Sequence, residues 1–165
     1  PPLDLICVPG GGGMNPLLND EETLDFLRKQ AANARYITSV CTGSLVLGAA
    51  GLLTGKRAAC HWMSRDMLKE FGATPDPSRV VIDGNLISGG GVTAGIDFGL
   101  AVVAEILGED AAKAIQLGIE YAPQPPFDAG TPDRAGETIE KAARDAAEER
   151  QAQRLAAVRK AAERL

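Results

Sequence analysis

The chain has 165 residues, the size of a single domain with one sizeable core, and a formal net charge of −5. Its basic residues are interspersed with acidic ones, and no apolar run reaches the roughly 18 residues of a membrane-spanning helix, so we expect neither nucleic acid nor a membrane as partner. Three cysteines without a CxxC pair and a single histidine favour a reducing cytoplasm and argue against a disulfide scaffold or a metal site.

The first part of the chain predicts alternating strands and helices. Residues 3–8 form a short apolar run, which predicts a strand buried on both faces, and residues 9–13 form a glycine loop. A helix is expected over residues 20–33. A second strand over residues 35–40 runs into a helix over residues 44–50. The second strand therefore meets its helix through a very short turn.

The middle of the chain continues this alternation. We expect a brief strand over residues 58–61 and a helix over residues 63–71 that Gly72 closes. An Asp-Gly-Asn turn predicts a hairpin over residues 80–88, and a long helix follows over residues 93–107. This alternation predicts an α/β fold with a mostly parallel sheet, in which ligands bind at the carboxyl ends of the strands.

The C-terminal part is expected to be helical on either side of an extended segment. A helix over residues 110–119 precedes residues 121–132, which contain four prolines and cannot be regular structure. Residues 133–165 predict one amphipathic helix, without a breaker after Gly136, that packs on the body or on a partner subunit. We therefore divide the chain into an α/β domain over residues 1–132 and this C-terminal helix.

Three loops made of small residues each connect a predicted strand to the helix that follows it. They lie at residues 9–13, 41–43 and 89–93. In a parallel sheet all three lie at the same edge, so they can face one another across a single crevice.

Cys41 is the candidate nucleophile. The pattern Ser39-x-Cys41-x-Gly43 resembles the nucleophile elbow of hydrolases, in which small residues let a strained turn expose the nucleophile. The N-terminus of the following helix favours a thiolate. The alternative is an inert cysteine at a strand end. Cys7 and Cys60 lack this setting and are interpreted as packing residues.

The groups around Cys41 each have a functional and a structural interpretation. The glycine loop either makes a turn or brings the N–H groups of Gly11 and Gly12, with that of Thr42, towards a developing negative charge. The Thr42 hydroxyl either lies beside the thiolate or caps the helix. His61 is the only imidazole, and it either lines the site or is a hydrogen-bonded core residue.

Several stretches resemble the ThiJ/PfpI superfamily over residues 1 to about 132. They are Val8-Pro9-Gly10-Gly11, Ser39-Val40-Cys41-Thr42-Gly43-Ser44, residues 49–58 followed by His61-Trp62, and residues 88–97. Within this superfamily, Tyr121-Ala122-Pro123-Gln124-Pro125-Pro126-Phe127-Asp128-Ala129-Gly130 resembles the isocyanide hydratases.

This resemblance implies a flavodoxin-like sandwich, a homodimer, and no metal or organic cofactor. It implies that the Cys41 thiolate attacks the terminal carbon of an isocyanide, that the nitrogen is protonated, and that water releases the thioimidate as an N-substituted formamide. It also implies that Thr42 hydrogen-bonds near the substrate and that the Val92 amide lies near the Cys41 sulfur. We count His61 and Thr93 as further residues that line the site.

One feature of the superfamily has no match in this sequence. Its members carry, before the position of Leu3, the first strands of the sheet and an acidic residue that hydrogen-bonds the catalytic cysteine. No Asp or Glu here corresponds to it, since Asp4 precedes the wrong strand. We therefore expect a sheet without these N-terminal strands, and either a separate segment that completes it or an inactive chain.

Two other functions remain open. The Val-Cys-Thr-Gly and Gly-Leu-Leu-x-Gly-Lys-Arg-Ala patterns also occur in the ligand-sensing domain of AraC-type transcription regulators. Those regulators continue into helix-turn-helix units with a basic face, whereas this sequence ends in a segment of mixed charge. A glyoxalase-like or hydrolase activity of the same superfamily is the other alternative, which the choice of substrate would separate from isocyanide hydration.

Overall fold

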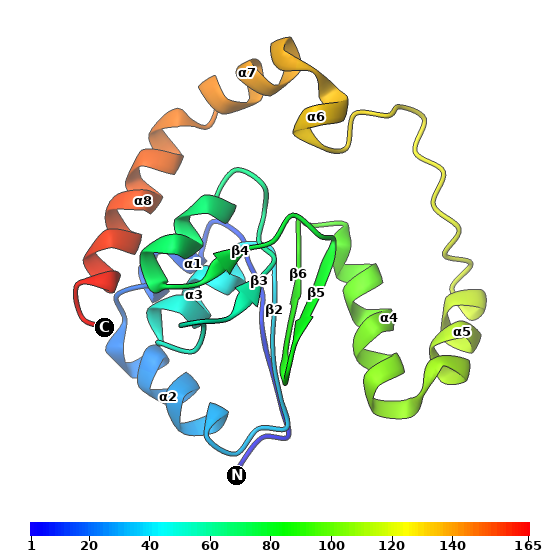
Figure 1. Cartoon of the computed structure of the whole chain (residues 1–165), viewed down its shortest axis with the longest axis horizontal. Helices are drawn as coiled ribbons and strands as arrows, with labels where there is room; N and C mark the ends of the chain where they lie inside the picture. The colour runs from blue at the N-terminus through cyan, green and yellow to red at the C-terminus, as the bar shows by residue number, and fades with distance from the viewer.

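A computed structural model describes residues 1–165 as a four-stranded sheet with helices on both faces (Figure 1). The strand order is β1 (Leu5–Val8), β2 (Tyr36–Val40), β6 (Leu86–Gly89) and β5 (Val80–Asp83). Neighbouring strands are parallel except for β5, which forms the predicted hairpin with β6. The predicted α/β fold with a mostly parallel sheet is confirmed.

Helices form a layer on each side of this sheet (Figure 1). On one side, α2 (Glu21–Ala31) and α3 (Gly43–Ala49) pack against β1 and β2, with the short helix α1 (Met14–Leu17) beside them. On the other side, α4 (Ala94–Leu107) packs on β6, β5 and β2. The carboxyl ends of the parallel strands therefore lie between two helical layers.

β1 lies at an edge of the sheet, which corrects the prediction of a strand buried on both faces. Ile6 and Val8 point towards the helices and are buried, whereas Leu5 is half-buried and Cys7 is exposed. The alternation follows because α4 packs chiefly on the other three strands, so one face of β1 is left largely uncovered. Cys7 is therefore a surface thiol and not a packing residue.

A two-stranded sheet and a 3₁₀ helix lie next to α3. β3 (Arg57–Ala58) pairs in parallel with β4 (Thr74–Pro75), and the 3₁₀ helix η1 (Arg65–Phe71) connects them in sequence. As predicted, η1 ends at Gly72, whose φ of 69° lies in the left-handed region. The strand expected over residues 58–61 is shorter than predicted and begins one residue earlier, because only Arg57 and Ala58 find pairing partners.

α4 and α5 (Glu109–Gly118) form a helical hairpin on the outside of the sheet (Figure 1). Half of the 12 exposed large apolar side chains of the chain lie on or directly after these two helices. They are Ile96, Ile106, Leu107, Ile115, Leu117 and Ile119. No helix of the structure has both the length and the apolar character that crossing a membrane requires.

The C-terminal region consists of three helices, so the prediction of one helix over residues 133–165 is wrong. These are α6 (Pro132–Ala135), α7 (Glu137–Asp145) and α8 (Glu148–Ala162), and the segment before α6 is irregular, as the prolines predict. α7 and α8 are separated at Ala147, which is only 2% exposed. Tertiary packing overrides helix propensity there, since the bend allows α8 to lie on η1, α3 and α1.

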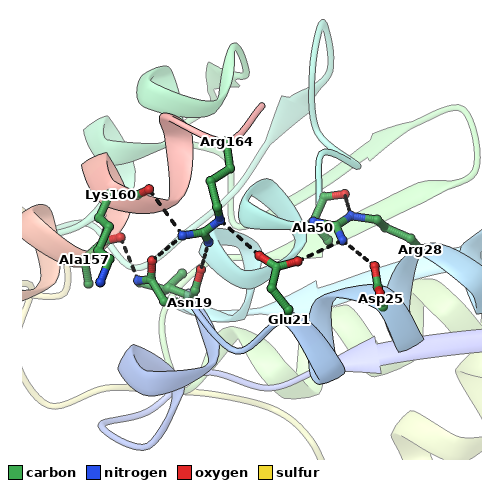
Figure 2. A network of polar contacts seen from close by, with 9 residues as sticks. Asn19, Glu21, Asp25, Arg28, Ala50, Ala157, Lys160 and Arg164 are labelled. Carbon is green, nitrogen blue, oxygen red and sulfur yellow. Dashed lines mark hydrogen bonds and ion pairs between the residues drawn. The ribbon is translucent and has the colours of Figure 1, made fainter.

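The end of α8 is held on the N-terminal part of the chain by a polar network (Figure 2). Arg164 donates to Asn19 Oδ1 at 2.7 Å and to the carbonyl oxygen of Leu18 at 3.0 Å. It also forms an ion pair of 3.0 Å with Glu21. Asn19 Nδ2 in turn donates to the carbonyl oxygen of Ala157 on α8 at 3.1 Å. α8 is therefore part of the body of the molecule.

The different burial of two cysteines gives a stability test. Cys7→Ser should change the free energy of unfolding by less than about 0.5 kcal/mol, because its side chain is exposed. Cys60→Ser should lower it by about 1 kcal/mol or more, because the buried thiol would be replaced by a hydroxyl that needs a hydrogen-bond partner. Urea denaturation of both variants measures the difference, and equal losses would contradict the edge position of β1.

Candidate functional site

The three glycine-rich or small-residue loops meet at one edge of the sheet, as their shared order predicts. In the parallel register Val8 lies opposite Ser39, and Val40 lies opposite Gly89. All three strands therefore end at the same level. The N–H group of Cys41 donates to the carbonyl oxygen of Gly89 at 3.0 Å, which fixes the turn after β2 to the end of β6.

Cys41 occupies a strained turn between β2 and α3. Its φ is 60°, and only one other non-glycine residue of the chain has a positive φ. A side chain in this left-handed region is disfavoured, and such residues cluster at functional sites. The thiol is partly exposed. This geometry is that of a nucleophile elbow, in which the strained residue presents its side chain above the sheet.

Two glycines allow the chain to pass close to Cys41. A Cβ at Gly43 would lie 2.0 Å from the carbonyl oxygen of Val8. A Cβ at Gly10 would lie 2.6 Å from the Thr42 nitrogen and 2.9 Å from the Cys41 Cβ. Any side chain at either position would collide with backbone, so the contact between the glycine loop and the elbow requires glycine on both sides.

A layer of buried serines supports the elbow from below. Ser39 and Ser44 share a hydrogen bond of 2.9 Å, and the Ser44 hydroxyl donates to the carbonyl oxygen of Ala59 at 2.6 Å. The Ala59 N–H donates to Ser88 Oγ at 2.8 Å. These bonds connect four parts of the chain, which are β2, α3, the residue that follows β3, and β6. Sequence reasoning used Ser39 only as a small residue and missed Ser44 and Ser88, whose signal was a hydroxyl within an apolar stretch.

The Thr42 hydroxyl does not cap α3. Its Oγ1 accepts a hydrogen bond of 3.1 Å from the Gly11 N–H, and no side chain caps this helix. The Gly11 amide therefore holds Thr42 and is not free for a substrate. The N–H groups of Gly12, Thr42 and Val92 make no hydrogen bond within the chain. Of the four backbone N–H groups expected at the site, only that of Gly11 is hydrogen-bonded within the chain.

His61 lies beside the loop that follows β6 and is half-buried. Its Cδ2 is 3.6 Å from the position of a Cβ at Gly91, and its Nδ1 accepts a hydrogen bond of 3.3 Å from the Met63 N–H. A neutral imidazole in this arrangement carries its proton on Nε2. Burial lowers the pKa of His61, and the positive charges of Arg154 and Arg150 add to this effect. His61 is therefore a neutral hydrogen-bond donor near pH 7.

A cavity of about 660 Å³ lies between the body and the C-terminal segment. His61, Val92 and Thr93 line it, whereas Cys41 does not. The remaining wall consists of Cys60, Trp62, Arg65, Pro77, Ser78, Arg79, Gly90, Gly91, Gly130, Thr131, Pro132, Asp133, Glu140 and Arg144. The predicted site residues therefore form two groups: one around the elbow with Gly11, Gly12 and Thr42, and one in the cavity wall.

Other candidates near the site have structural roles. Cys60 is 2% exposed, and burial raises its pKa to about 12, so its thiol stays protonated. Thr93 Oγ1 accepts a hydrogen bond of 3.2 Å from Arg79, which also pairs with Asp97. Tyr121 donates to the same Asp97 carboxylate at 3.0 Å. No group of three or more His, Cys, Asp or Glu side chains is arranged to hold a metal ion.

Comparison with known families identifies the fold. Residues 2–105 match the model of the DJ-1/PfpI family. The chain belongs to the DJ-1/PfpI family. This confirms the resemblance to ThiJ/PfpI proteins that the sequence motifs indicate.

Relatives of this DJ-1/PfpI chain include a protein named as an enzyme and one named as a regulator. It is 62% identical over 144 residues to a protein named isonitrile hydratase from Pseudomonas putida, covering 87% of this chain and 63% of that protein. A crystal structure of a ThiJ/PfpI family protein from Pseudomonas syringae superposes with a TM-score of 0.90 at 46% identity, covering 94% of this chain and 64% of that one. The transcriptional regulator GbdR from Pseudomonas aeruginosa is 33% identical over 117 residues, covering 70% of this chain and 32% of the regulator. The chain thus spans less than two thirds of each.

The close contact at Gly43 is tested by adding one methyl group. Gly43→Ala should lower the free energy of unfolding by about 3 kcal/mol or more, because the methyl group meets backbone that cannot move aside. Gly99→Ala within α4 is the matched control, since nothing lies within 4 Å of its Cβ position. We expect that control to gain up to about 1 kcal/mol from helix propensity. Denaturant unfolding compares the two, and similar stabilities would rule out the contact.

The burial of His61 predicts a pH dependence of stability. Because the folded state lowers the pKa of His61 from its ordinary value of 6.5, the unfolded chain binds this proton more readily. Stability should therefore fall as the pH decreases from 7.5 through 6.5 towards the lowered pKa of His61. The pKa values of Asp66, Asp76 and Glu109 are also lowered, and these carboxylates take up protons only at more acidic pH. His61→Gln should reduce the loss of stability between about pH 7.5 and 5.5. Urea denaturation at several pH values measures the free energy of unfolding. An unchanged dependence of this free energy on pH would contradict the prediction.

Proposed function

We propose that this chain hydrates isocyanides (isonitriles) to N-substituted formamides with Cys41 as the nucleophile. The observation that carries the proposal is the partly exposed thiol of Cys41 in a left-handed elbow at the carboxyl edge of the sheet. The choice of reaction is supported by the 62% identity to a protein named isonitrile hydratase.

The proposed reaction has two stages. The Cys41 thiolate attacks the terminal carbon of R–N≡C, so that a C–S bond forms and the carbon takes a proton to give the thioimidate R–N=CH–S. Water then adds to the same carbon, and the nitrogen takes a proton. The C–S bond breaks as the hydroxyl proton returns to the acid that protonated the carbon, which regenerates the Cys41 thiolate and releases R–NH–CHO. The overall reaction consumes one water molecule and involves no oxidant or reductant.

The surrounding groups stabilise charge in this scheme. Negative charge develops on the isocyanide when sulfur attacks, and the unpaired N–H groups of Gly12, Thr42 and Val92 are the donors that we assign to it. The Thr42 hydroxyl, which accepts from Gly11, keeps its own O–H free to donate to the substrate. His61 contributes an Nε2–H donor from the cavity wall. We place the R group of the isocyanide in this cavity.

We further propose that the acid that protonates the intermediate comes from a segment outside this chain. No carboxylate hydrogen-bonds Cys41, and β1 has a free edge where a further strand can pair. A strand added beside β1 would also cover the exposed face of Cys7. Such a segment would complete both the sheet and the site.

The assembly that we propose is a homodimer in the cytoplasm. The exposed apolar side chains of the α4–α5 hairpin, together with Phe127, which is 78% exposed, provide a surface that a second copy can bury. The free thiols of all three cysteines are compatible with a reducing compartment.

Formamide production from an aryl isocyanide tests the proposal. Cys41→Ala should reduce turnover by about a thousandfold or more without loss of fold, whereas the matched control Cys7→Ala should retain full turnover. The assay is run on the chain alone and after addition of the N-terminal segment of the Pseudomonas putida relative, with methylglyoxal as an alternative substrate. Turnover that survives Cys41→Ala, or no isocyanide turnover in either form, would contradict the proposal.

A second candidate is ligand sensing without catalysis. Cys41 is not among the residues that line the cavity, and the regulator GbdR shares 33% identity with this chain. If sensing is the function, an isocyanide or another small molecule should bind the chain with equal affinity before and after Cys41→Ala. Calorimetric titration of both forms, beside the turnover assay, separates the two functions.

A further inference from the structure

Three arginines line the cavity between the body and the C-terminal segment, and two of them are already paired. Arg79, in the loop before β5, pairs with Asp97. Arg144 of α7 pairs with Glu140 at 2.6 Å. Arg65 of η1 takes part in none of the ion pairs or side-chain hydrogen bonds of the structure. Arg65 is therefore the one arginine of the cavity wall without a partner.

Arg65 is also the least exposed of these arginines. It is half-buried, whereas Arg79 and Arg144 are exposed. A guanidinium that is partly removed from water loses hydration, and an opposite charge that binds it offsets this loss. Its flat array of N–H donors matches the two oxygens of a carboxylate. An anion that enters the cavity therefore has an unoccupied partner in Arg65.

The carboxylates closest in sequence to Arg65 have other partners. Asp66 pairs with Lys69 at 2.9 Å, and Glu70 pairs with Arg159 of α8 at 3.3 Å. The helix α3, which packs on η1, carries no ionisable side chain. The acidic residues of η1 thus do not neutralise Arg65.

The carboxylates of the neighbouring C-terminal helices do not neutralise Arg65 either. Asp133 of α6, the second acidic residue of the cavity wall, is exposed and forms no ion pair with Arg65. Glu148 and Glu149 lie in the first turn of α8, which also packs on η1. Both are exposed, and neither pairs with Arg65. The positive charge of Arg65 is therefore unbalanced within the chain.

A further positive charge lies beside Arg65. Arg154 of α8 is only 5% exposed, and its Nη1 donates to Oγ of Ser64, the residue before Arg65, at 2.9 Å. Burial lowers the pKa of His61, and the positive charge of Arg154 adds to this effect. The side of the cavity formed by η1 and the residues before it therefore has a positive potential, which attracts anions.

The other polar groups of the wall that remain free are mainly donors. His61 presents an Nε2–H group, because its Nδ1 accepts from the Met63 N–H at 3.3 Å. Thr93 Oγ1 accepts from Arg79 at 3.2 Å, which leaves its O–H free to donate. The Thr131 hydroxyl makes no hydrogen bond within the chain. A carboxylate only accepts hydrogen bonds, so this wall suits it better than a neutral amide of the same shape.

We propose that the cavity binds a carboxylate carried by the R group of the substrate, and that the Arg65 guanidinium is its principal partner. This inference rests on the proposed function, which places the R group in the cavity, and deepens it by naming the substrate class. The substrate is then an isocyanide whose substituent bears a carboxylate, and the product is the corresponding formamido acid.

A binding measurement tests this inference without any turnover. The ligands are 4-formamidocyclohexanecarboxylate and the corresponding neutral carboxamide, which have the same shape and do not absorb where tryptophan does. Trp62 is the only tryptophan of the chain and lines the cavity, so its fluorescence reports occupation of this site. We expect the carboxylate to bind at least about tenfold more tightly than the carboxamide, because a charge-assisted pair replaces a neutral hydrogen bond.

Variants of Arg65 assign the preference to this residue. Arg65→Met keeps the apolar stem and should weaken binding of the carboxylate about tenfold, while the carboxamide should bind within about twofold of the parent value. Arg65→Lys keeps the charge but not the flat fork, and should lose about threefold. Arg150→Met is the matched control, since it removes an exposed arginine of α8 that does not line the cavity, and should leave both affinities unchanged.

Four results would overturn the inference. They are the absence of carboxylate binding, equal affinities for the carboxylate and the carboxamide, unchanged carboxylate binding in a folded Arg65→Met chain, and an equal loss in Arg150→Met. If Arg65→Met does not fold by circular dichroism, Arg65→Gln replaces it and should show the same loss. Carboxylate binding that depends on Arg65 supports the inference even where no isocyanide is turned over, a result that would contradict the proposed function alone.

Discussion

The carbonyl oxygen of Val8 lies only 2.0 Å from where a side chain at position 43 would begin, and the arrangement of the site depends on this approach. Because Gly43 has no side chain, the start of α3 can lie against the end of β1. The turn between β2 and α3 must then be completed within very few residues, and Cys41 is the residue that takes the left-handed conformation. The strain at Cys41 is thus a consequence of two neighbouring strands and one helix meeting at a single point.

Polar groups beneath and beside this point keep it in place. The buried hydroxyls of Ser39, Ser44 and Ser88 are all hydrogen-bonded, and no buried side-chain nitrogen or oxygen of the structure lacks a partner. A fully satisfied network of this kind rigidifies the backbone around it, because each broken bond would leave a buried polar group without a partner. A second buried network holds α8, in which Arg154 donates to Asn15 Oδ1 and to Ser64 Oγ.

The elbow and the cavity wall offer different groups to a ligand. The elbow offers the Cys41 thiol and unpaired N–H groups, whereas the cavity offers His61, Val92 and walls from the C-terminal segment. In the proposed reaction, the reacting carbon of a small electrophile lies at the elbow and its substituent lies in the cavity. The cavity wall includes Thr131, Pro132 and Glu140, so under the proposed function the C-terminal segment contributes to the choice of substituent.

Local patterns in the sequence were sufficient to predict the parallel sheet, the meeting of three loops at one edge and the strained turn at Cys41, because apolar periodicity and glycine placement act over a few residues. The sequence also determined which residues can carry chemistry. Only the tertiary structure decided that Cys7 is exposed, that the C-terminal segment bends at Ala147, that the Gly11 amide is occupied by Thr42 and that Arg154 binds Asn15. Each of these depends on contacts between segments far apart in the chain, such as the 139 residues between Asn15 and Arg154, and no local pattern contains that information.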